Sequence, residues 1–444
     1  MINDRDPYLM NPPSPIELLQ KLIRFDTTNP PGNEEACVHY ISSLLEGAGI
    51  PAVIVARQPG RSNLIARLTG RGQAPPLLLY GHVDVVMTEG QQWRYPPFEG
   101  IVADDSVWGR GALDMKGGVS MMVSAILRAK YEGLLPAGDI VLAILADEEA
   151  GGDNGAGYLV SEYPEWFKGI RFAIGEVGAA TTYLGGKKFY PIQIAEKQIC
   201  WLQATVKGPG GHGSRPMRGG AMAKMAQFLL DLDQARLPVH ITPVAQMMIE
   251  AIISELDSKD KLHFQQLLDP QRADVALEQM GVAGRFLEPL LRNTVNATIV
   301  QGGQKVNVVP SEIHLQLDGR LLPGFKPADL IEELQAIIGP DVELKVLRHD
   351  PSPVVSDMEM FDLLADILRR ADHGAIPIPM LLAGVTDGRL FSKLGIQTYG
   401  FTPMKLPEGF DYGELIHAAD EHVPVEAITF GSEAIFALLK RYGQ

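Results

Sequence analysis

The architecture of this 444-residue chain can be worked out from one segment, Leu77-Leu78-Leu79-Tyr80-Gly81-His82-Val83-Asp84. Its apolar first half predicts a buried strand, and polar side chains follow where that strand ends. Because side chains alternate along a strand, His82 and Asp84 are expected to point to the same side. Imidazole is a good zinc ligand, and a nearby carboxylate can accept the other ring N–H and fix the tautomer. The pair by itself is also compatible with a structural role.

The segments around this strand alternate between helix and strand patterns. Ser14 and Glu17 can form a capping box for a first helix, with Pro15 in its first turn. Further helices are expected at about 33–48, 117–131, 357–370 and 425–441. Further strands are expected at 53–55, 64–66, 140–145 and 397–401. Strands that alternate with helices indicate α/β layering. We therefore expect a discontinuous α/β domain formed by residues 1–196 and 350–444.

The middle of the chain, residues 197–349, has a different pattern. Strands are expected at 199–206, 294–300, 312–318 and 342–347. One helix is expected at 220–233, and another carries Leu330, Leu334 and Ile338 on one face and is closed by Gly339. Ile313 and Leu315 alternate with polar residues, so one face of their strand is expected to be wet. The order β-α-β-β-α-β predicts a ferredoxin-like α+β unit inserted into the first domain. Residues of about 238–291 interrupt this unit and are expected to be helical.

Acidic residues follow the other predicted strands. Asp114 sits in a Gly-rich turn before a helix, where an ordinary N-cap is the alternative explanation. Asp147-Glu148-Glu149 follows the strand at 140–145. Three adjacent acids repel one another unless a cation lies among them, although a solvated loop is the alternative. Adjacent Glu148 and Glu149 also allow one to bind metal while the other stays free as a base.

Two further residues complete a candidate ligand set. Glu176 ends another apolar strand, and His417 lies in the C-terminal segment, although each alone could be an ordinary acid or histidine. His82, Asp114, Glu149 and Glu176 place one imidazole and three carboxylates at strand ends, where open α/β sheets carry their sites. His417 adds a second imidazole from the C-terminal segment. Two borderline metal ions need such a mixture, with one carboxylate shared between them. The set therefore predicts a centre for two metal ions.

Composition argues against several classes of partner. The formal net charge is −15, so neither a nucleic acid nor an anionic membrane surface is an expected partner. No apolar run approaches the roughly 18 residues that a membrane span requires. Cys37 and Cys200 are too few for a disulfide framework, so both are expected to be buried and unpaired. A cytoplasmic protein without a signal peptide is the simplest expectation.

Eight motifs, taken in order, resemble those of one enzyme family: GHVDVV (81–86), WRYPPFEG (93–100), VWGRGALDMKGG (107–118), ADEEAGG (146–152), GPGGHGSRP (208–216), NVVPS (307–311), GVTDGR (384–389) and HAADEHVP (417–424). The chain resembles the metallohydrolases that include aminoacylase, acetylornithine deacetylase, succinyl-diaminopimelate desuccinylase, glutamate carboxypeptidase and carnosinase-like dipeptidases. This resemblance implies a zinc-hydrolase α/β/α sandwich with an inserted ferredoxin-like lid and dimerisation domain. It further implies a homodimer formed through that domain.

The resemblance also implies a role for each candidate residue. It assigns His82 and Glu176 to one Zn²⁺, Glu149 and His417 to a second, and Asp114 to a bridge between them. Co²⁺ or Mn²⁺ could substitute for zinc. It further implies that Asp84 orients His82 and that Glu148 is the general base for a metal-bridging water. For substrate binding, it implies that His212 polarises the scissile carbonyl, that Arg320 holds a substrate carboxylate and that Asn307 contacts substrate. It also implies that the Asp114–Met115 peptide is cis.

The expected activity is hydrolysis of an amide or peptide bond in a small substrate with a free carboxylate, as in a carboxypeptidase or dipeptidase. Removal of an acyl group from an N-acyl amino acid is the main alternative. A non-catalytic binding protein on the same fold is a weaker one, because every expected ligand and the base are present. One departure from the family is Val177-Gly178-Ala179-Ala180, where many relatives have Pro-Thr after the metal-binding acid.

Overall fold

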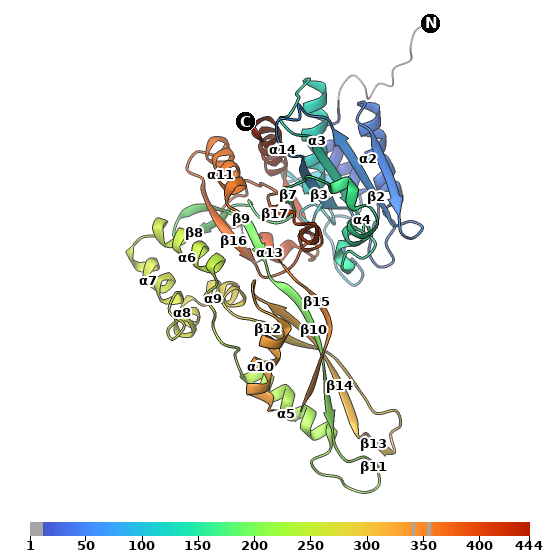
Figure 1. The fold of residues 1–444 in the computed structure, drawn as a ribbon, viewed down its shortest axis with the longest axis vertical. Coiled ribbons are helices and arrows are strands. Elements are labelled where there is room, and N and C mark those ends of the chain that lie inside the picture. The colour runs from blue at the N-terminus through green and yellow to red at the C-terminus, as the bar shows by residue number, and fades with distance from the viewer. Residues whose placement is uncertain (1–11, 340–341, 353–356) are drawn as a thin grey trace. The chain divides into compact units, whose positions relative to one another are not determined.

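The computed structural model describes residues 12–339, 342–352 and 357–444 (Figure 1). The chain divides into two compact units. Unit 1 comprises Met1–Ile194, Ser356–Met380 and Thr386–Gln444, and unit 2 comprises Ala195–Val355 and Leu381–Val385. Unit 2 is thus an insertion into the sequence of unit 1.

Unit 1 is built on a mixed β-sheet. Its strands are β1 (Ala52–Ala56), β2 (Ser62–Leu68), β3 (Leu77–His82), β6 (Ile140–Leu145), β7 (Phe172–Gly175), β8 (Thr182–Leu184), β9 (Lys187–Glu196), β16 (Ile376–Leu382) and β17 (Gln397–Gly400). The described strands are ordered β1-β2-β6-β3-β7-β17-β9-β16, with β8 beside β9. Strand β3 is parallel to both β6 and β7, and β17 is parallel to β7. The carboxyl ends of these four strands therefore meet at one edge of the sheet.

Helices cover both faces of this sheet. They are α1 (Pro15–Ile23), α2 (Glu35–Gly47), α3 (Lys116–Tyr131), α4 (Ala156–Glu162), α11 (Glu359–Ala371), α12 (Gly388–Phe391), α13 (Tyr412–Leu415) and α14 (Val425–Arg441). On β3, Leu78 and Tyr80 share a hydrophobic core with Leu159 of α4. Gly81 faces the other side, where a Cβ atom would lie 3.0 Å from Val119 Cγ2 of α3. The residues on the two faces of β3 thus pack against two different helical layers, as the α/β prediction requires.

The predictions for the α1 capping box and for the two cysteines are confirmed. Ser14 Oγ accepts a hydrogen bond from Glu17 N at 3.2 Å, while Ser14 N donates to Glu17 Oε2 at 2.9 Å, which forms the capping box of α1. Cys37 and Cys200 are free and buried. Among the described residues, no helix combines the length and apolar character that crossing a membrane requires.

Strands β8, β9 and β16 of unit 1 and a small second sheet were not predicted. Strand β16 contains Pro377 and Pro379, which argue against a strand from sequence, yet β16 lies at the end of the sheet order, where proline is tolerated. The second sheet, in the order β18-β5-β4, consists of β4 (Ile101–Ala103), β5 (Ser106–Trp108) and β18 (His422–Pro424). Strands of three residues are too short to show a periodicity. This sheet pairs the C-terminal segment with the chain just before Asp114.

Unit 2 contains an antiparallel four-stranded sheet with helices α5 (Ala221–Gln234) and α10 (Pro327–Ile338). The order is β12-β14-β10-β15, formed by β10 (Gln198–Lys207), β12 (Thr294–Gly302), β14 (Glu312–Leu321) and β15 (Glu343–Asp350). Phe228 of α5 and Leu330 of α10 share a core with Leu315 of β14. Side chains of β14 alternate between buried and partly exposed, as predicted. A separate two-stranded ladder joins β11 (Gly211–His212) to β13 (Val308–Val309).

The segment expected to be a helical insertion does contain helices. They are α6 (Pro243–Glu255), α7 (Ser258–Leu267), α8 (Ala273–Met280) and α9 (Val282–Leu287). Thr242 caps α6 by accepting a hydrogen bond from Ala245 N at 3.3 Å. The helices lie between α5 and β12 in the chain, so they interrupt the βαββαβ order without changing the strand order of the sheet.

Candidate metal centre

Three neighbouring parallel strands bring the predicted ligands of unit 1 to one edge of the sheet. His82 is the last residue of β3 and is paired with Leu145, the last residue of β6. Glu149 follows β6 in a 3-10 turn, Glu148–Ala150, and Glu176 directly follows β7. Because the strands are parallel, their polar ends are adjacent although they are distant in sequence.

Two groups of possible ligands meet at this edge, and they share one residue. In the first, His82 Nε2 lies 3.1 Å from both Asp114 Oδ1 and Glu176 Oε2. In the second, His417 Nε2 lies 3.3 Å from both Asp114 Oδ2 and Glu149 Oε2. The ligand atoms within each group lie within 4.8 Å of one another. Asp114 therefore presents one carboxylate oxygen to each histidine, which is the arrangement expected of a shared ligand.

The residues present fit a pair of divalent metal ions. Two imidazoles and three carboxylates form the donor set that zinc and related ions take. Glu149 Oε1 is buried and has no hydrogen-bond partner among the described residues, which is costly unless another group meets it. Burial raises the pKa of Glu176 to about 7. A cation among these acids would offset their desolvation and mutual repulsion.

Asp114 is an ionised centre of this arrangement. Burial alone would raise the pKa of Asp114, but hydrogen bonds with His417 and His82 more than offset it and hold the pKa well below the ordinary value. The Asp114–Met115 peptide bond, which directly precedes α3, is cis, as the family resemblance implied.

The Nδ1 atom of His82 faces two oxygens of Asp84. It lies 3.0 Å from the Asp84 carbonyl oxygen, to which it can donate, and 3.4 Å from Asp84 Oδ1. The Asp84 carboxylate, which was predicted to accept this N–H, also accepts shorter hydrogen bonds from other donors. Asn29 Nδ2 and the backbone N–H groups of Glu148 and Glu149 donate to it at 2.8, 3.1 and 3.1 Å. Asp84 thus holds the Glu148–Glu149 turn as well as lying beside His82.

Glu148 belongs to neither group of possible ligands. It is half-buried next to Glu149, and burial together with the charge of Glu176 raises its pKa well above the ordinary value. Of the two adjacent acids, the described geometry therefore brings Glu149 to the shared Asp114 and leaves the Glu148 carboxylate outside both groups.

The remaining candidates, His212, Asn307 and Arg320, belong to unit 2. His212 is exposed on β11, and its Nδ1 lies 2.8 Å from Ser214 Oγ. Asn307 lies beside it, because its carbonyl oxygen accepts a hydrogen bond from Gly213 N at 2.9 Å. Arg320 makes a bidentate pair with Asp318, with Nε–Oδ1 at 2.8 Å and Nη2–Oδ2 at 3.1 Å. The substrate-binding roles of all three stay predictions.

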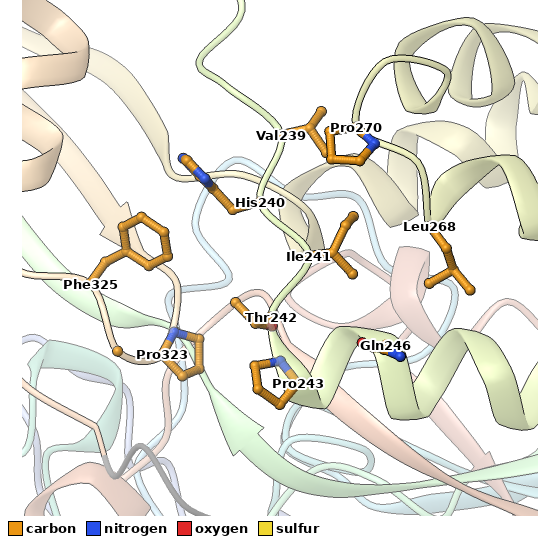
Figure 2. A pocket seen from close by; sticks show the side chains of 11 residues that line it. Val239, His240, Ile241, Thr242, Pro243, Gln246, Leu268, Pro270, Pro323 and Phe325 are labelled. Atoms are coloured by element: carbon orange, nitrogen blue, oxygen red, sulfur yellow. The ribbon is translucent and has the colours of Figure 1, made fainter.

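A pocket elsewhere in unit 2 lacks comparable chemistry (Figure 2). It has a volume of about 720 Å³ and is lined by apolar and proline side chains together with His240, Thr242 and Phe325. His240 Nε2 is bound to Glu333 Oε1 at 2.6 Å, and its ring centroid lies 4.6 Å from that of Phe325. The pocket therefore has one histidine that is already satisfied and no group of possible metal ligands among its described lining residues.

Residues near the candidate ligands were missed from sequence. Arg110 and Glu421 form a buried ion pair at 2.7 Å, and Arg61 pairs with both Glu34 and Asp147. Arg110 lies in the motif VWGRGALDMKGG, four residues before Asp114, and Glu421 lies in HAADEHVP, four residues after His417. This closeness to candidate ligands was the only signal in the sequence that could have indicated a role for them. Charged residues in such motifs are otherwise explained equally well by solvent exposure.

Two groups of possible metal ligands that share Asp114 lie at the edge of a sheet covered by helices on both faces, and this arrangement is the candidate metal centre. Residues 78–441 match the family described as Peptidase family M20/M25/M40, and the chain belongs to this family. It is 27% identical over 372 residues to a probable carboxypeptidase S-like 2 of Dictyostelium discoideum, which covers 79% of this chain and 68% of the relative. It is 26% identical over 436 residues to succinyl-diaminopimelate desuccinylase of Paracoccus denitrificans, which covers 97% and 98% of the two chains.

A solved structure has the same fold. The M20 family metallo-carboxypeptidase Sso-CP2 of Sulfolobus solfataricus superposes with a TM-score of 0.72 at 18% identity, covering 97% of this chain and 99% of that chain.

Proposed function

We propose that this protein is a two-zinc hydrolase of the carboxypeptidase or dipeptidase type, which cleaves an amide bond in a small substrate with a free carboxylate. The observation that carries this proposal is the geometry of Asp114, whose two oxygens each lie 3.1–3.3 Å from a different histidine. Membership of a metallopeptidase family supports the reaction class.

Each residue of the centre has a distinct task in this proposal. His82 and Glu176 hold one ion, Glu149 and His417 hold the other, and Asp114 is shared. When bound, the two ions supply Lewis-acid polarisation and a hydrolytic water of lowered pKa. Glu148, whose carboxylate joins neither ligand group, takes a proton from that water and returns it to the leaving amine.

Residues of unit 2 provide substrate recognition in the proposal. The planar guanidinium of Arg320 suits a bidentate contact with the substrate carboxylate, which would replace its pairing with Asp318. His212 contributes a hydrogen bond to the oxygen of the scissile carbonyl as it becomes negative. Asn307, whose backbone is tied to Gly213, contributes a further polar contact from the same ladder.

Removal of an acyl group from an amino acid is the second candidate. The desuccinylase similarity, which extends over nearly the whole chain, favours it. Both reactions leave a carboxylate for Arg320, so the recognition proposed above serves either one. A non-catalytic binding protein is disfavoured because all five candidate ligands and Glu148 are retained.

A homodimer formed through unit 2 is part of the proposal. Strand β12 lies at an edge of the described four-stranded sheet and exposes Ile299 and Val300. An edge strand with unpaired backbone groups and apolar side chains is a template for pairing with a second copy. The cytoplasmic location inferred from cysteine usage stays a prediction.

Two measurements test the proposed function. Metal analysis of the purified chain is expected to give two equivalents of zinc, cobalt or manganese, and near-zero metal would contradict it. A side-by-side assay of dipeptides and N-acetyl amino acids then separates the two reactions. Faster turnover of N-acyl amino acids by the metal-loaded enzyme would replace the peptidase assignment with the deacylase one.

A further inference from the structure

Glu421 links its own segment to the loop that carries Asp114. Its side chain is fully buried. Glu421 Oε1 accepts hydrogen bonds from Leu113 N at 2.8 Å and Asp114 N at 3.1 Å. Glu421 Oε2 accepts from Gly111 N at 3.0 Å and from Arg110 Nη1 at 2.7 Å. One carboxylate therefore satisfies three backbone donors of the 111–114 loop, including the N–H of the shared ligand itself.

Arg110 extends this link to the other side of the candidate centre. Its Nη2 donates to the His417 carbonyl at 3.2 Å and to Gln91 Oε1 at 2.8 Å. Gln91 Nε2 also donates to the His417 carbonyl, at 2.8 Å. His417 has a φ of +64°, a conformation that a non-glycine residue adopts only when its surroundings hold it. Two side-chain donors on its carbonyl provide that restraint.

We propose that Glu421, Arg110 and Gln91 act as positioning residues that set the separation of Asp114 from His417 and so complete the metal site of Asp114, Glu149 and His417. This inference rests on the proposed function. Groups behind metal ligands orient them and tune their affinity. Here, one connected network reaches the backbone of both residues, so a change in it alters the distance between their ligand atoms.

The geometry also explains why a carboxylate is required at position 421. Both of its oxygens face donors, two on each side. A glutamine in the same place has one oxygen and one NH₂ group, so its NH₂ would face donors whichever way the amide is turned. Glu421→Gln keeps the side-chain volume but no longer offers an acceptor to every donor, so it tests the hydrogen bonds without changing the packing.

The experiment is calorimetric titration of the metal-free full-length protein with Zn²⁺, together with its thermal unfolding. The wild type is expected to bind two equivalents. In Glu421→Gln, the affinity for one of them should fall about 10- to 100-fold, the usual effect of losing such a partner. Gln91→Ala, at a partly exposed residue, removes only one hydrogen bond to the His417 carbonyl and should weaken the same ion about 2- to 10-fold.

Asp139→Asn is the matched control. Asp139 also pairs with an arginine, Arg67, at 2.9 Å and accepts a backbone N–H, from Gly70, at 2.9 Å. It precedes β6, at the opposite edge of the sheet from the candidate ligands. This variant should lower the unfolding temperature and leave both zinc affinities unchanged.

The possible outcomes distinguish a failure of this inference from a failure of the proposed function on which it rests. If the wild type binds two ions and Glu421→Gln binds both with unchanged affinity, the positioning role is wrong and the proposed function stands. Equal weakening in Asp139→Asn would likewise overturn the positioning role. If Glu421→Gln does not fold, unchanged affinities in Gln91→Ala would overturn it. A wild type that binds no zinc would overturn the proposed function, and this inference with it.

Discussion

Asp84 Oδ2 accepts a hydrogen bond from the backbone N–H of Glu149 at 3.1 Å. The same carboxylate accepts the N–H of Glu148 through Oδ1, also at 3.1 Å, and is completely buried. A residue expected to act on His82 alone therefore also holds the turn that carries a candidate ligand and the candidate base.

Replacing Asp84 with asparagine should disturb both ligand groups. Its NH₂ would face a backbone donor in either orientation, leaving buried donors unpaired at a cost of about 1–3 kcal/mol of the free energy of unfolding. Zinc affinity should fall about 10- to 100-fold because the Glu149 backbone is released. Unfolding and zinc titration of the metal-free protein measure both effects. A destabilised variant with wild-type zinc affinity would limit Asp84 to a structural role.

Replacing Glu148 with glutamine should separate catalysis from metal binding. Because the Glu148 carboxylate joins neither ligand group, the variant should still bind two metal ions. Loss of a general base should lower kcat about 10²- to 10⁴-fold. Metal content and turnover of the best substrate are the measurements, with Glu162→Gln on α4 as an exposed control. Near wild-type turnover would show that another group is the base.

Replacing Arg320 with lysine tests the carboxylate half of the proposal. Lysine keeps the charge but loses the fork that now binds Asp318 through two hydrogen bonds. KM for a carboxylate substrate should rise about 10- to 100-fold, the effect of losing a charged hydrogen bond. KM for the matching carboxamide should hardly change. Arg348→Lys is the control, because Arg348 also pairs with an aspartate two residues further on, with Nε and Nη2 both meeting Asp350 Oδ2. Equal effects on both substrates would refute carboxylate recognition by Arg320.

A lysine on the exposed edge of unit 2 should prevent dimerisation. Val300 on β12 is 56% exposed, and an edge lysine opposes strand pairing by its charge. Light scattering after size exclusion should show a dimer for the wild type and a monomer for Val300→Lys. Val53→Lys is the control, because Val53 is 50% exposed on β1, an edge strand of the main sheet of unit 1. A dimer that survives Val300→Lys would place the interface elsewhere.

The stability of unit 1 should fall in acid partly through Asp372. Tyr190 OH donates to Asp372 Oδ2 at 2.7 Å, and Lys188 forms an ion pair with it. Burial alone would raise the pKa of Asp372, but these partners lower it below the ordinary value. As pH falls, the unfolded state therefore takes up the proton first, so the stabilisation is present above about pH 4 and is lost below it.

Unfolding temperatures of the wild type and Asp372→Asn between pH 6 and pH 3 measure this loss. The difference between the two proteins should shrink as the pH falls. The exposed Asp362→Asn on α11 controls for general acid effects. A difference that stays constant down to pH 3 would mean that Asp372 makes no pH-dependent contribution.

Much of the fold could be predicted from local patterns. The strand at Leu77–His82 and the helix at Lys116–Tyr131 were found because apolar runs and periodicity are properties of neighbouring residues. Strand β16 was missed because its two prolines are acceptable only at a sheet edge, and an edge is not a local property. The three-residue strands β4, β5 and β18 were missed because pairing with one another, rather than periodicity, defines them.

The sequence by itself determined that His82, Glu149 and Glu176 were expected to lie together, because each follows a strand of the predicted α/β sheet, where such sheets carry their sites. Tertiary structure alone decided how they are shared. It directs one oxygen of Asp114 to His82 and the other to His417, and it leads the Asp84 carboxylate to two backbone amides. It also brings Glu421 to the Asp114 loop across more than 300 residues of chain. Such contacts depend on distances between distant segments, which residue order does not encode locally.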